Sequence, residues 1–325
     1  MKHLCSPRTL FESWQSVRKK AGAPGFDNVS VRDFQQNERN NICRLSDDLC
    51  SGFYHPSPLR ETYIPKSTPG KWRRLAIPTV KDRIVQHASN RILQSIFENS
   101  FAPCSFAYRG NMGIREAIAL VREGLRSGMA WTVRGDIKGC FDEIDRPILS
   151  GLLKKIIPDA LFLSIITESI EAPMVNKGFL KRTYRGIPQG SPLSPFLSNL
   201  YLHLFDKAML SSGAFLVRYA DDWLVLAPDF HAAEKGLHTA SDALARLRIR
   251  LNTEKSGVYD LSRQKITFLG HCLDARIIDA DQKGWKRAIN AARKYRSPRS
   301  TEEFIQARSE LLGIRSMYQN SGHLC

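Results

Sequence analysis

The stretch FLVRYADDWLVLA, residues 215–227, decides the fold. Two short apolar runs, rich in aromatic and β-branched residues, flank the step Ala220-Asp221-Asp222, and this pattern predicts a β-hairpin. The hairpin would present two adjacent carboxylates, Asp221 and Asp222, at its tip. Because like charges repel, a positive partner is expected there, and a divalent cation suits paired hard oxygen ligands. The alternative is a solvated turn that happens to be acidic.

The composition predicts a globular protein with a polyanionic partner. Its 325 residues are 42% apolar, which is enough for a sizeable core, and 48 Lys and Arg against 32 Asp and Glu give a net charge of +16. This excess favours nucleic acid over a membrane as the partner. The sequence contains no apolar run of membrane-spanning length and no signal-peptide core. Seven scattered cysteines without a C-x-x-C pair argue against a disulfide framework or a zinc site and favour a reducing cytoplasm.

A second acidic position lies upstream of the hairpin. Residues 130–137, AWTVRGDI, predict a strand that delivers Asp136 at its carboxyl end, which is a common placement for a catalytic group. Phe141 follows five residues later. The next acids, Asp142 and Asp145, are expected at the surface or at the start of a helix.

Two further segments carry polar groups suited to binding. Residues 59–64 and 73–77 predict a strand pair joined by the basic turn KSTPGKW, residues 66–72. This turn either grips a triphosphate or is simply solvated. In residues 185–195, three prolines and two glycines force a defined loop around Gln189. An amide held rigidly ahead of a helix is suited to contact a substrate or a template.

The remaining pattern is mostly helical. Helices are expected over 9–20, 80–99, 112–126 and 231–248, and Ser30 is expected to cap a polar helix running to about Cys50. Residues 265–272, KITFLGHC, predict one further strand, and the last 50 residues predict two basic helices. The fold class is therefore α+β.

Six segments, taken in chain order, resemble the reverse transcriptases, in particular those of bacterial group II introns. They are KWRRLAIPTVKDRIVQ (71–86), DIKGCFDEID (136–145), RGIPQGSPLSPFLSNLYLHLFD (185–206), RYADD (218–222), LNTEKS (251–256) and FLGH (268–271). The segment GAPGFDNVS (22–30) also resembles the N-terminal extension of that lineage. The resemblance implies a right-hand polymerase fold, with an N-terminal extension at 1–58, fingers at 59–129, a palm at 130–272 and a short helical thumb at 273–325.

The resemblance also implies a site and its ligands. Two Mg²⁺ ions, for which Mn²⁺ could substitute, would be held by Asp136, Asp221, Asp222 and the backbone carbonyl of Ile137. The substrates would be deoxynucleoside triphosphates, an RNA template and a DNA primer or product. The candidate residues for binding the nucleotide are Arg73, Lys66, Lys71, Gln189 and Phe141, and Phe141 would be the steric gate against a 2′-hydroxyl. Lys255 is the candidate to protonate the leaving pyrophosphate.

Departures from the intron proteins shape the expected role. Only about 50 residues follow FLGH, so we expect no maturation or nuclease segment. The predicted function is therefore a stand-alone RNA-directed DNA polymerase that copies a dedicated structured noncoding RNA, and analogy with compact members of the family predicts a role in antiphage defence. The alternatives are a mobile group II intron-derived reverse transcriptase and a non-polymerising RNA-binding scaffold.

Overall fold

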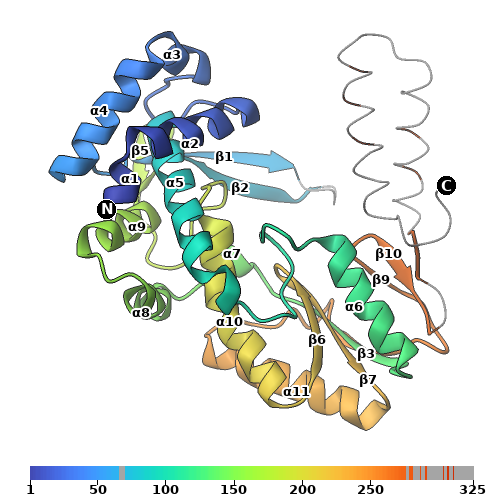
Figure 1. Ribbon diagram of the computed structural model, residues 1–325. Coiled ribbons are helices and arrows are strands. Elements are labelled where there is room, and N and C mark those ends of the chain that lie inside the picture. The colour runs from blue at the N-terminus through green and yellow to red at the C-terminus, as the bar shows by residue number, and fades with distance from the viewer. Residues whose placement is uncertain are drawn as a thin grey trace. The chain divides into compact units, whose positions relative to one another are not determined.

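The computed structural model describes residues 1–65, 70–275 and 278–280, together with the single positions Lys286, Asn290, Glu303, Gln306 and Glu310. The chain forms two compact units (Figure 1). The first contains residues 1–101, 139–202 and 247–249, and the second contains 102–138, 203–246 and 250–325. Both units combine helices with a sheet of mostly antiparallel strands, so the predicted α+β class is confirmed.

The first unit is mainly helical, and short polar side chains mark the beginnings of its helices. Ser30 accepts a hydrogen bond from the backbone of Asp33, and Thr79, Asp145 and Asp159 cap later helices in the same way. The helices of this unit are α1 (Lys2–Cys5), α2 (Pro7–Lys20), α3 (Val31–Gln36), α4 (Glu38–Ser51), α5 (Val80–Phe97), η1 (Glu98–Ser100), α7 (Cys140–Glu143), α8 (Arg146–Ile156) and α9 (Ala160–Glu171).

The helix predicted from Ser30 to Cys50 is wrong in one respect. Asn37 has φ −128° and ψ 36°, outside the helical region, so the segment is two helices, α3 and α4. The break allows the α4 face carrying Leu45 and Leu49 to be buried.

The sheet of the first unit has the strand order β2-β1-β4-β5. Strands β1 (Leu59–Pro65) and β2 (Trp72–Ile77) pair antiparallel, which confirms the predicted strand pair. Strand β4 (Met174–Asn176) pairs parallel with β1 and antiparallel with β5 (Phe179–Lys181). The β4–β5 hairpin was not predicted from the sequence.

The sheet of the second unit contains the predicted hairpin. It has the order β6-β7-β3-β8, with every neighbouring pair antiparallel. Its strands are β3 (Trp131–Asp136), β6 (Phe215–Tyr219), β7 (Asp222–Ala227) and β8 (Gly257–Asp260). Helix α10 (Ser194–Ser211) ends in this unit, which also contains α6 (Ile114–Arg126) and α11 (Phe230–Arg246).

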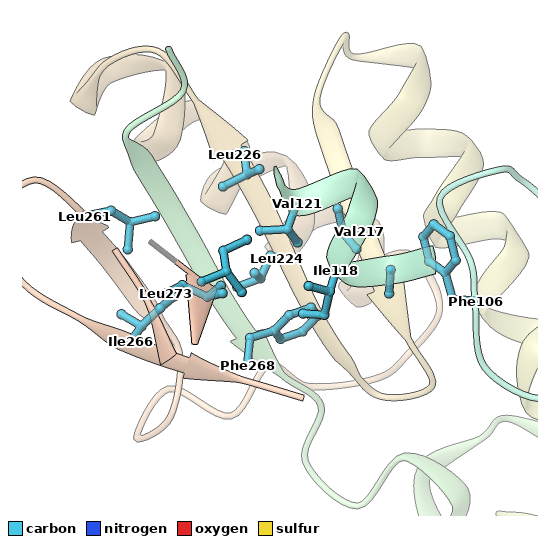
Figure 2. Packing of buried hydrophobic residues seen from close by; sticks show 12 residues of the cluster. Phe106, Ile118, Val121, Val217, Leu224, Leu226, Leu261, Ile266, Phe268 and Leu273 are labelled. Atoms are coloured by element: carbon cyan, nitrogen blue, oxygen red, sulfur yellow. The ribbon is translucent and has the colours of Figure 1, made fainter. Parts of the chain in front are cut away.

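Helices α6 and α11 cover opposite faces of this sheet. A Cβ atom on Gly236 of α11 would lie 3.1 Å from Val225, whereas one on Gly124 of α6 would lie 2.5 Å from Leu226. Successive residues of β7 point to opposite faces, so glycine allows each helix to approach its own face. Figure 2 shows the core on the α6 side, where Val121 lies beside Leu224 and Leu226.

A small second sheet completes that core. Strands β9 (Ile266–Phe268), β10 (His271–Leu273) and β11 (Ile278–Ala280) pair antiparallel in the order β11-β10-β9. The single strand predicted over 265–272 is therefore wrong. The chain reverses at Leu269 and Gly270, which have φ of 50° and 79°, the backbone of a tight hairpin turn.

Two further predictions concern the C-terminal helices and membrane-spanning segments. The two C-terminal helices predicted for the last 50 residues lie almost wholly outside the described residues. Among the helices that the structure does describe, none combines the length and the apolar character that crossing a membrane requires.

Candidate active site

Strand pairing brings two of the three predicted carboxylate residues together. Asp136, the last residue of β3, lies directly opposite Asp222, the first residue of β7. Asp222 also pairs with Tyr219 of β6, so the hairpin loop consists only of Ala220 and Asp221. The prediction of two carboxylates at the tip holds for Asp221, whereas Asp222 lies in the strand. The three acids therefore share one end of the sheet.

Ala220 holds this loop in an unusual conformation. Its φ is 57°, in the left-handed region that glycine ordinarily occupies in such a two-residue turn. A non-glycine residue there costs on the order of 1–3 kcal/mol unless its surroundings enforce it. The side chain is 7% exposed, and the Ala220 carbonyl accepts a 3.0 Å hydrogen bond from the Arg218 guanidinium. The turn is thus held from inside the protein.

The electrostatic environment of Asp222 favours a bound cation. Burial is the main cause that raises the pKa of this carboxyl to about 7, and the neighbouring acids Asp221 and Asp136 raise it further. Arg134 and Lys255 oppose this rise only in part. The Oδ1 atom of Asp222 is buried and makes no hydrogen bond with the described residues. A buried carboxylate oxygen without a donor is costly, and a divalent cation would satisfy it.

Asp136 is held by residues of the segment LNTEKS, residues 251–256. Its Oδ2 atom accepts hydrogen bonds from the Asn252 amide at 2.7 Å and from the Lys255 ammonium at 3.4 Å. Its backbone N–H donates to the Ser256 hydroxyl at 3.1 Å, and its carbonyl accepts from the Asn252 N–H at 2.9 Å. Sequence reasoning singled out Lys255 but missed Asn252 and Ser256 as partners. Their presence within LNTEKS was the only available indication.

A fully buried ion pair between Arg218 of β6 and Asp206 of α10 stabilises the hairpin. The Arg218 guanidinium donates to both carboxylate oxygens of Asp206, each at 2.6 Å, and both side chains are 0% exposed. The same guanidinium donates to the Ser105 hydroxyl at 2.7 Å. Backbone hydrogen bonds from Arg218 to Cys104 and from Phe106 to Arg218 fix this part of β6. Sequence reasoning missed this network, which connects the hairpin to α10.

The backbone beside Asp136 is packed without room for a side chain. A Cβ atom on Gly135 would lie 2.0 Å from the indole of Trp223, its partner in the β3–β7 register. Trp223 is 0% exposed and lies 5.4 Å from the Phe205 ring of α10, centroid to centroid. Glycine at position 135 therefore allows the aromatic ring to seat directly under the strand that carries Asp136.

The residues predicted to bind the nucleotide lie in the first unit, and the structure groups only some of them. Arg73 and Lys71 are exposed near the β1–β2 turn, and Lys66 lies outside the described residues. Successive strand residues point to opposite faces, so Arg74 points away from the Arg73 side. Arg74 was not predicted, and its guanidinium pairs with Asp142 at 2.7 Å.

The loop at 186–189 contacts the backbone of Phe141 and the side chain of Asp142. The Phe141 carbonyl accepts a 2.8 Å hydrogen bond from the Ile187 N–H, and the Gln189 amide lies 3.5 Å from the Asp142 carboxylate. Gly186 has φ 79°, and a Cβ atom there would lie 2.8 Å from the Phe141 carbonyl oxygen. Asp142, Ile187 and Gln189 border a recess that opens to solvent. It is lined in part by Arg74, Asp142, Arg146, Thr183, Gly186 and Gln189.

The donor set at Asp136, Asp221 and Asp222 fits a hard divalent cation. Carboxylate and carbonyl oxygens are the ligands that Mg²⁺ prefers. The Ile137 carbonyl, predicted as a further ligand, is adjacent to Asp136, and the Ile137 side chain is 2% exposed. Within the described parts of the chain, no three His, Cys, Asp or Glu side chains are already gathered as a metal cage. The three aspartates would therefore have to converge on the ion.

The sequence of this chain is similar to those of known proteins. Residues 64–273 match the family described as reverse transcriptase (RNA-dependent DNA polymerase). Protein YkfC of Escherichia coli is 29% identical in an alignment of 311 positions that covers 83% of this chain and 81% of YkfC. The group II intron-encoded protein LtrA of Lactococcus lactis subsp. cremoris is 34% identical over 211 residues, which are 64% of this chain and 35% of LtrA. The match thus spans about a third of LtrA.

Telomerases are among the solved structures with a similar fold. The apo telomerase of Candida tropicalis has a TM-score of 0.58 at 15% identity, covering 82% of this chain and 58% of that one. The telomerase of Candida albicans, solved with a TWJ fragment of telomeric RNA, has a TM-score of 0.57 at 12% identity, covering 90% and 59%. These similarities show a right-hand polymerase fold. The family match over residues 64–273 establishes that the chain belongs to the reverse transcriptases, the RNA-dependent DNA polymerases.

Proposed function

We propose that this chain extends a DNA strand on an RNA template, with Asp136, Asp221 and Asp222 as its catalytic carboxylates. The observation that carries the proposal is the register of β3 and β7, which sets Asp136 opposite Asp222 with Asp221 next to it in the turn. Strand extension is an in-line phosphoryl transfer, which depends on positioning and on neutralising charge. A carboxylate cluster on a rigid sheet edge serves both needs.

The three aspartates and the Ile137 carbonyl would hold two Mg²⁺ ions. When bound, these ions would supply charge neutralisation for the attacking 3′-oxygen and the leaving pyrophosphate. The protein's own contribution is to keep the ligands in place. Asn252 and Ser256 orient Asp136 through its side chain and backbone, and Arg218 holds the turn through the Ala220 carbonyl.

Lys255 is the proposed proton donor for the leaving pyrophosphate. Its ammonium lies 3.4 Å from Asp136 Oδ2, and its side chain is 64% exposed. The long contact and the exposure leave the flexible side chain able to reorient toward a phosphate. In the free protein the same ammonium offsets part of the negative charge of the aspartates.

The nucleotide would be selected by residues of the first unit. Arg73 and Lys71 are exposed cations suited to the triphosphate, as is Lys66 by its place in the same basic turn. Phe141 would exclude the 2′-hydroxyl of a ribonucleotide, and Gln189 would contact the nucleotide or the template base. The Ile187 and Gly186 contacts that fix the Phe141–Asp142 backbone support a rigid gate.

Primer extension tests the polymerase assignment. Wild-type protein is incubated with an RNA template, an annealed DNA primer, Mg²⁺ and deoxynucleotides, beside the Asp221→Asn plus Asp222→Asn variant. We expect extension by the wild type and a loss of at least about a hundredfold in the variant, because loss of a key electrostatic element typically costs that much. Equal extension by both proteins would rule out this site. RNA binding without extension by either would favour the scaffold alternative.

The template is proposed to be a dedicated structured noncoding RNA, and the biological role antiphage defence. The excess of cations supports an RNA partner. The match to YkfC covers most of both proteins, whereas the match to LtrA covers 35% of LtrA. The defence role itself rests on analogy with compact reverse transcriptases.

One second candidate is favoured by a specific observation. The 34% identity with LtrA supports a polymerase derived from a mobile group II intron. Sequencing the RNA and DNA that copurify with the protein from its native host separates the two. One structured RNA encoded beside the gene, with its complementary DNA, supports the dedicated template. An intron RNA supports the intron-derived enzyme.

A further inference from the structure

The β4–β5 hairpin, residues 174–181, with its continuation to Arg185, is built to project from the sheet of the first unit. Asn176 pairs with Phe179, so the loop contains only Lys177 and Gly178. Their φ values of 48° and 85° match the tight turn that suits the twist of two antiparallel strands. Strand β5 is the last in its sheet. Its outer edge pairs with no further strand that the structure describes, and all three of its residues are exposed.

Large apolar side chains cover this hairpin and are exposed to solvent. Phe179 is 80% exposed, Leu180 59% and Tyr184 86%. A single exposed aromatic residue needs no explanation, but several close together mark an interaction surface. Phe179 and Leu180 are successive residues of the edge strand and point to its opposite faces, and Tyr184 follows within the same segment.

The positive charge of the segment favours a polyanionic partner. Residues 174–185 contain Lys177, Lys181, Arg182 and Arg185 and no acidic residue. Arg185 pairs with Glu143 at 3.2 Å. The other three cations are exposed, and none forms an ion pair with any residue that the structure describes. A lysine on an edge strand can simply prevent aggregation, but this role explains neither the exposed rings nor the additional cations.

We propose that the β4–β5 hairpin binds unpaired bases of the RNA strand. Aromatic rings stack on bases that are not paired, and neighbouring cations contact the phosphates between them. Phe179 and Tyr184 provide the rings, and Lys177, Lys181 and Arg182 provide the charge. This inference rests on the proposed function for the choice of RNA, and it assigns the hairpin a preference for single strands over duplexes.

Matched variants test the stacking. Phe179→Ala removes a ring that is 80% exposed, and the control Phe53→Ala removes one that is 79% exposed outside the hairpin. Affinity for a labelled single-stranded RNA is measured by fluorescence anisotropy. We expect Phe179→Ala to bind at least about fivefold more weakly than wild type, because stacking of a base on an aromatic ring contributes substantially to the affinity for a single strand. We expect Phe53→Ala to bind like wild type. Blunt RNA duplex should bind all three proteins equally.

A second pair of variants tests the charge independently of the rings. Lys177→Ala plus Lys181→Ala is compared with Lys154→Ala plus Lys155→Ala, two exposed lysines at the end of α8. Loss of two phosphate contacts to a single strand should reduce the slope of log affinity against log salt by about 1.4. The α8 control should leave the slope unchanged. Thermal unfolding of each variant confirms that the exposed substitutions leave the fold intact.

Primer extension in parallel separates this inference from the proposed function. If the wild type extends primers and Phe179→Ala binds single-stranded RNA as well as Phe53→Ala does, the hairpin inference is overturned and the polymerase assignment stands. If hairpin variants lose RNA affinity but the wild type extends nothing, the surface is supported and the polymerase assignment fails. A photocrosslinker at position 179 should attach to RNA. Attachment only to a protein, or a wild type without affinity for single-stranded RNA, would overturn the hairpin inference.

Discussion

Replacing Arg218 with methionine should destabilise the second unit strongly. The substitution leaves the Asp206 carboxylate, which is 0% exposed, without its guanidinium partner. Breaking a buried pair in this way costs about 3–5 kcal/mol, because the remaining charge is neither solvated nor neutralised. At roughly 2–4 °C per kcal/mol for a unit of 150–250 residues, the Tm should fall by about 6–20 °C. The variant also removes the 3.0 Å hydrogen bond to the Ala220 carbonyl, so primer extension should fall even below the new Tm.

The assay is thermal and urea unfolding followed by tryptophan fluorescence, to which buried Trp223 contributes. Arg8→Met is the matched control, because Arg8 forms an ion pair with Glu12 while remaining 89% exposed, and exposed pairs contribute little to stability. Arg218→Met combined with Asp206→Leu should recover much of the stability, since no buried charge remains. A loss in Arg218→Met no larger than in Arg8→Met would refute the reasoning.

Three further predictions follow from the same contacts. In metal-free buffer, the pKa of Asp222 is raised to about 7 from an ordinary 3.8, so between these values the folded state holds a proton that the unfolded state has released. The free energy of unfolding should therefore fall as the pH rises from about 4 to about 7. Urea unfolding of Asp222→Asn should lack this decline. Phe141→Ala should raise incorporation of ribonucleotides relative to deoxynucleotides in single-turnover extension, and an unchanged ratio would contradict the gate. Gly135→Ala should lower the Tm sharply because its Cβ would lie 2.0 Å from Trp223, and adding Trp223→Leu should restore part of the loss if that clash is the cause.

Local pattern was sufficient to predict the elements that carry the aspartates. The two apolar runs around Asp221 and the strand ending at Asp136 contain their own short-range information, and the structure has strands at these places. Predicted helices and strands were wrong where one or two residues change the direction of the backbone. Asn37 splits one expected helix, and the positive φ values at Leu269 and Gly270 split one expected strand.

The partners of the site could not be read from the sequence. Asn252 lies 116 residues from Asp136, and Asp206 lies twelve residues from Arg218 on a different element, so neither spacing produces a periodic pattern. Arg218 appears in the sequence as one more cation of a basic chain, and only its burial reveals it as a structural support. The β4–β5 hairpin was similarly missed, although Lys177-Gly178 between short apolar runs was a readable turn.

The most direct test of the central claim is Mg²⁺-dependent primer extension by single variants of the three aspartates. Wild type, Asp136→Asn, Asp221→Asn and Asp222→Asn are compared with Asp229→Asn, an exposed aspartate after β7. We expect DNA synthesis on an RNA template by wild type and by Asp229→Asn, and a loss of at least about a hundredfold in each of Asp136→Asn, Asp221→Asn and Asp222→Asn. Full synthesis by Asp136→Asn, or synthesis unaffected by chelation of Mg²⁺, would contradict it.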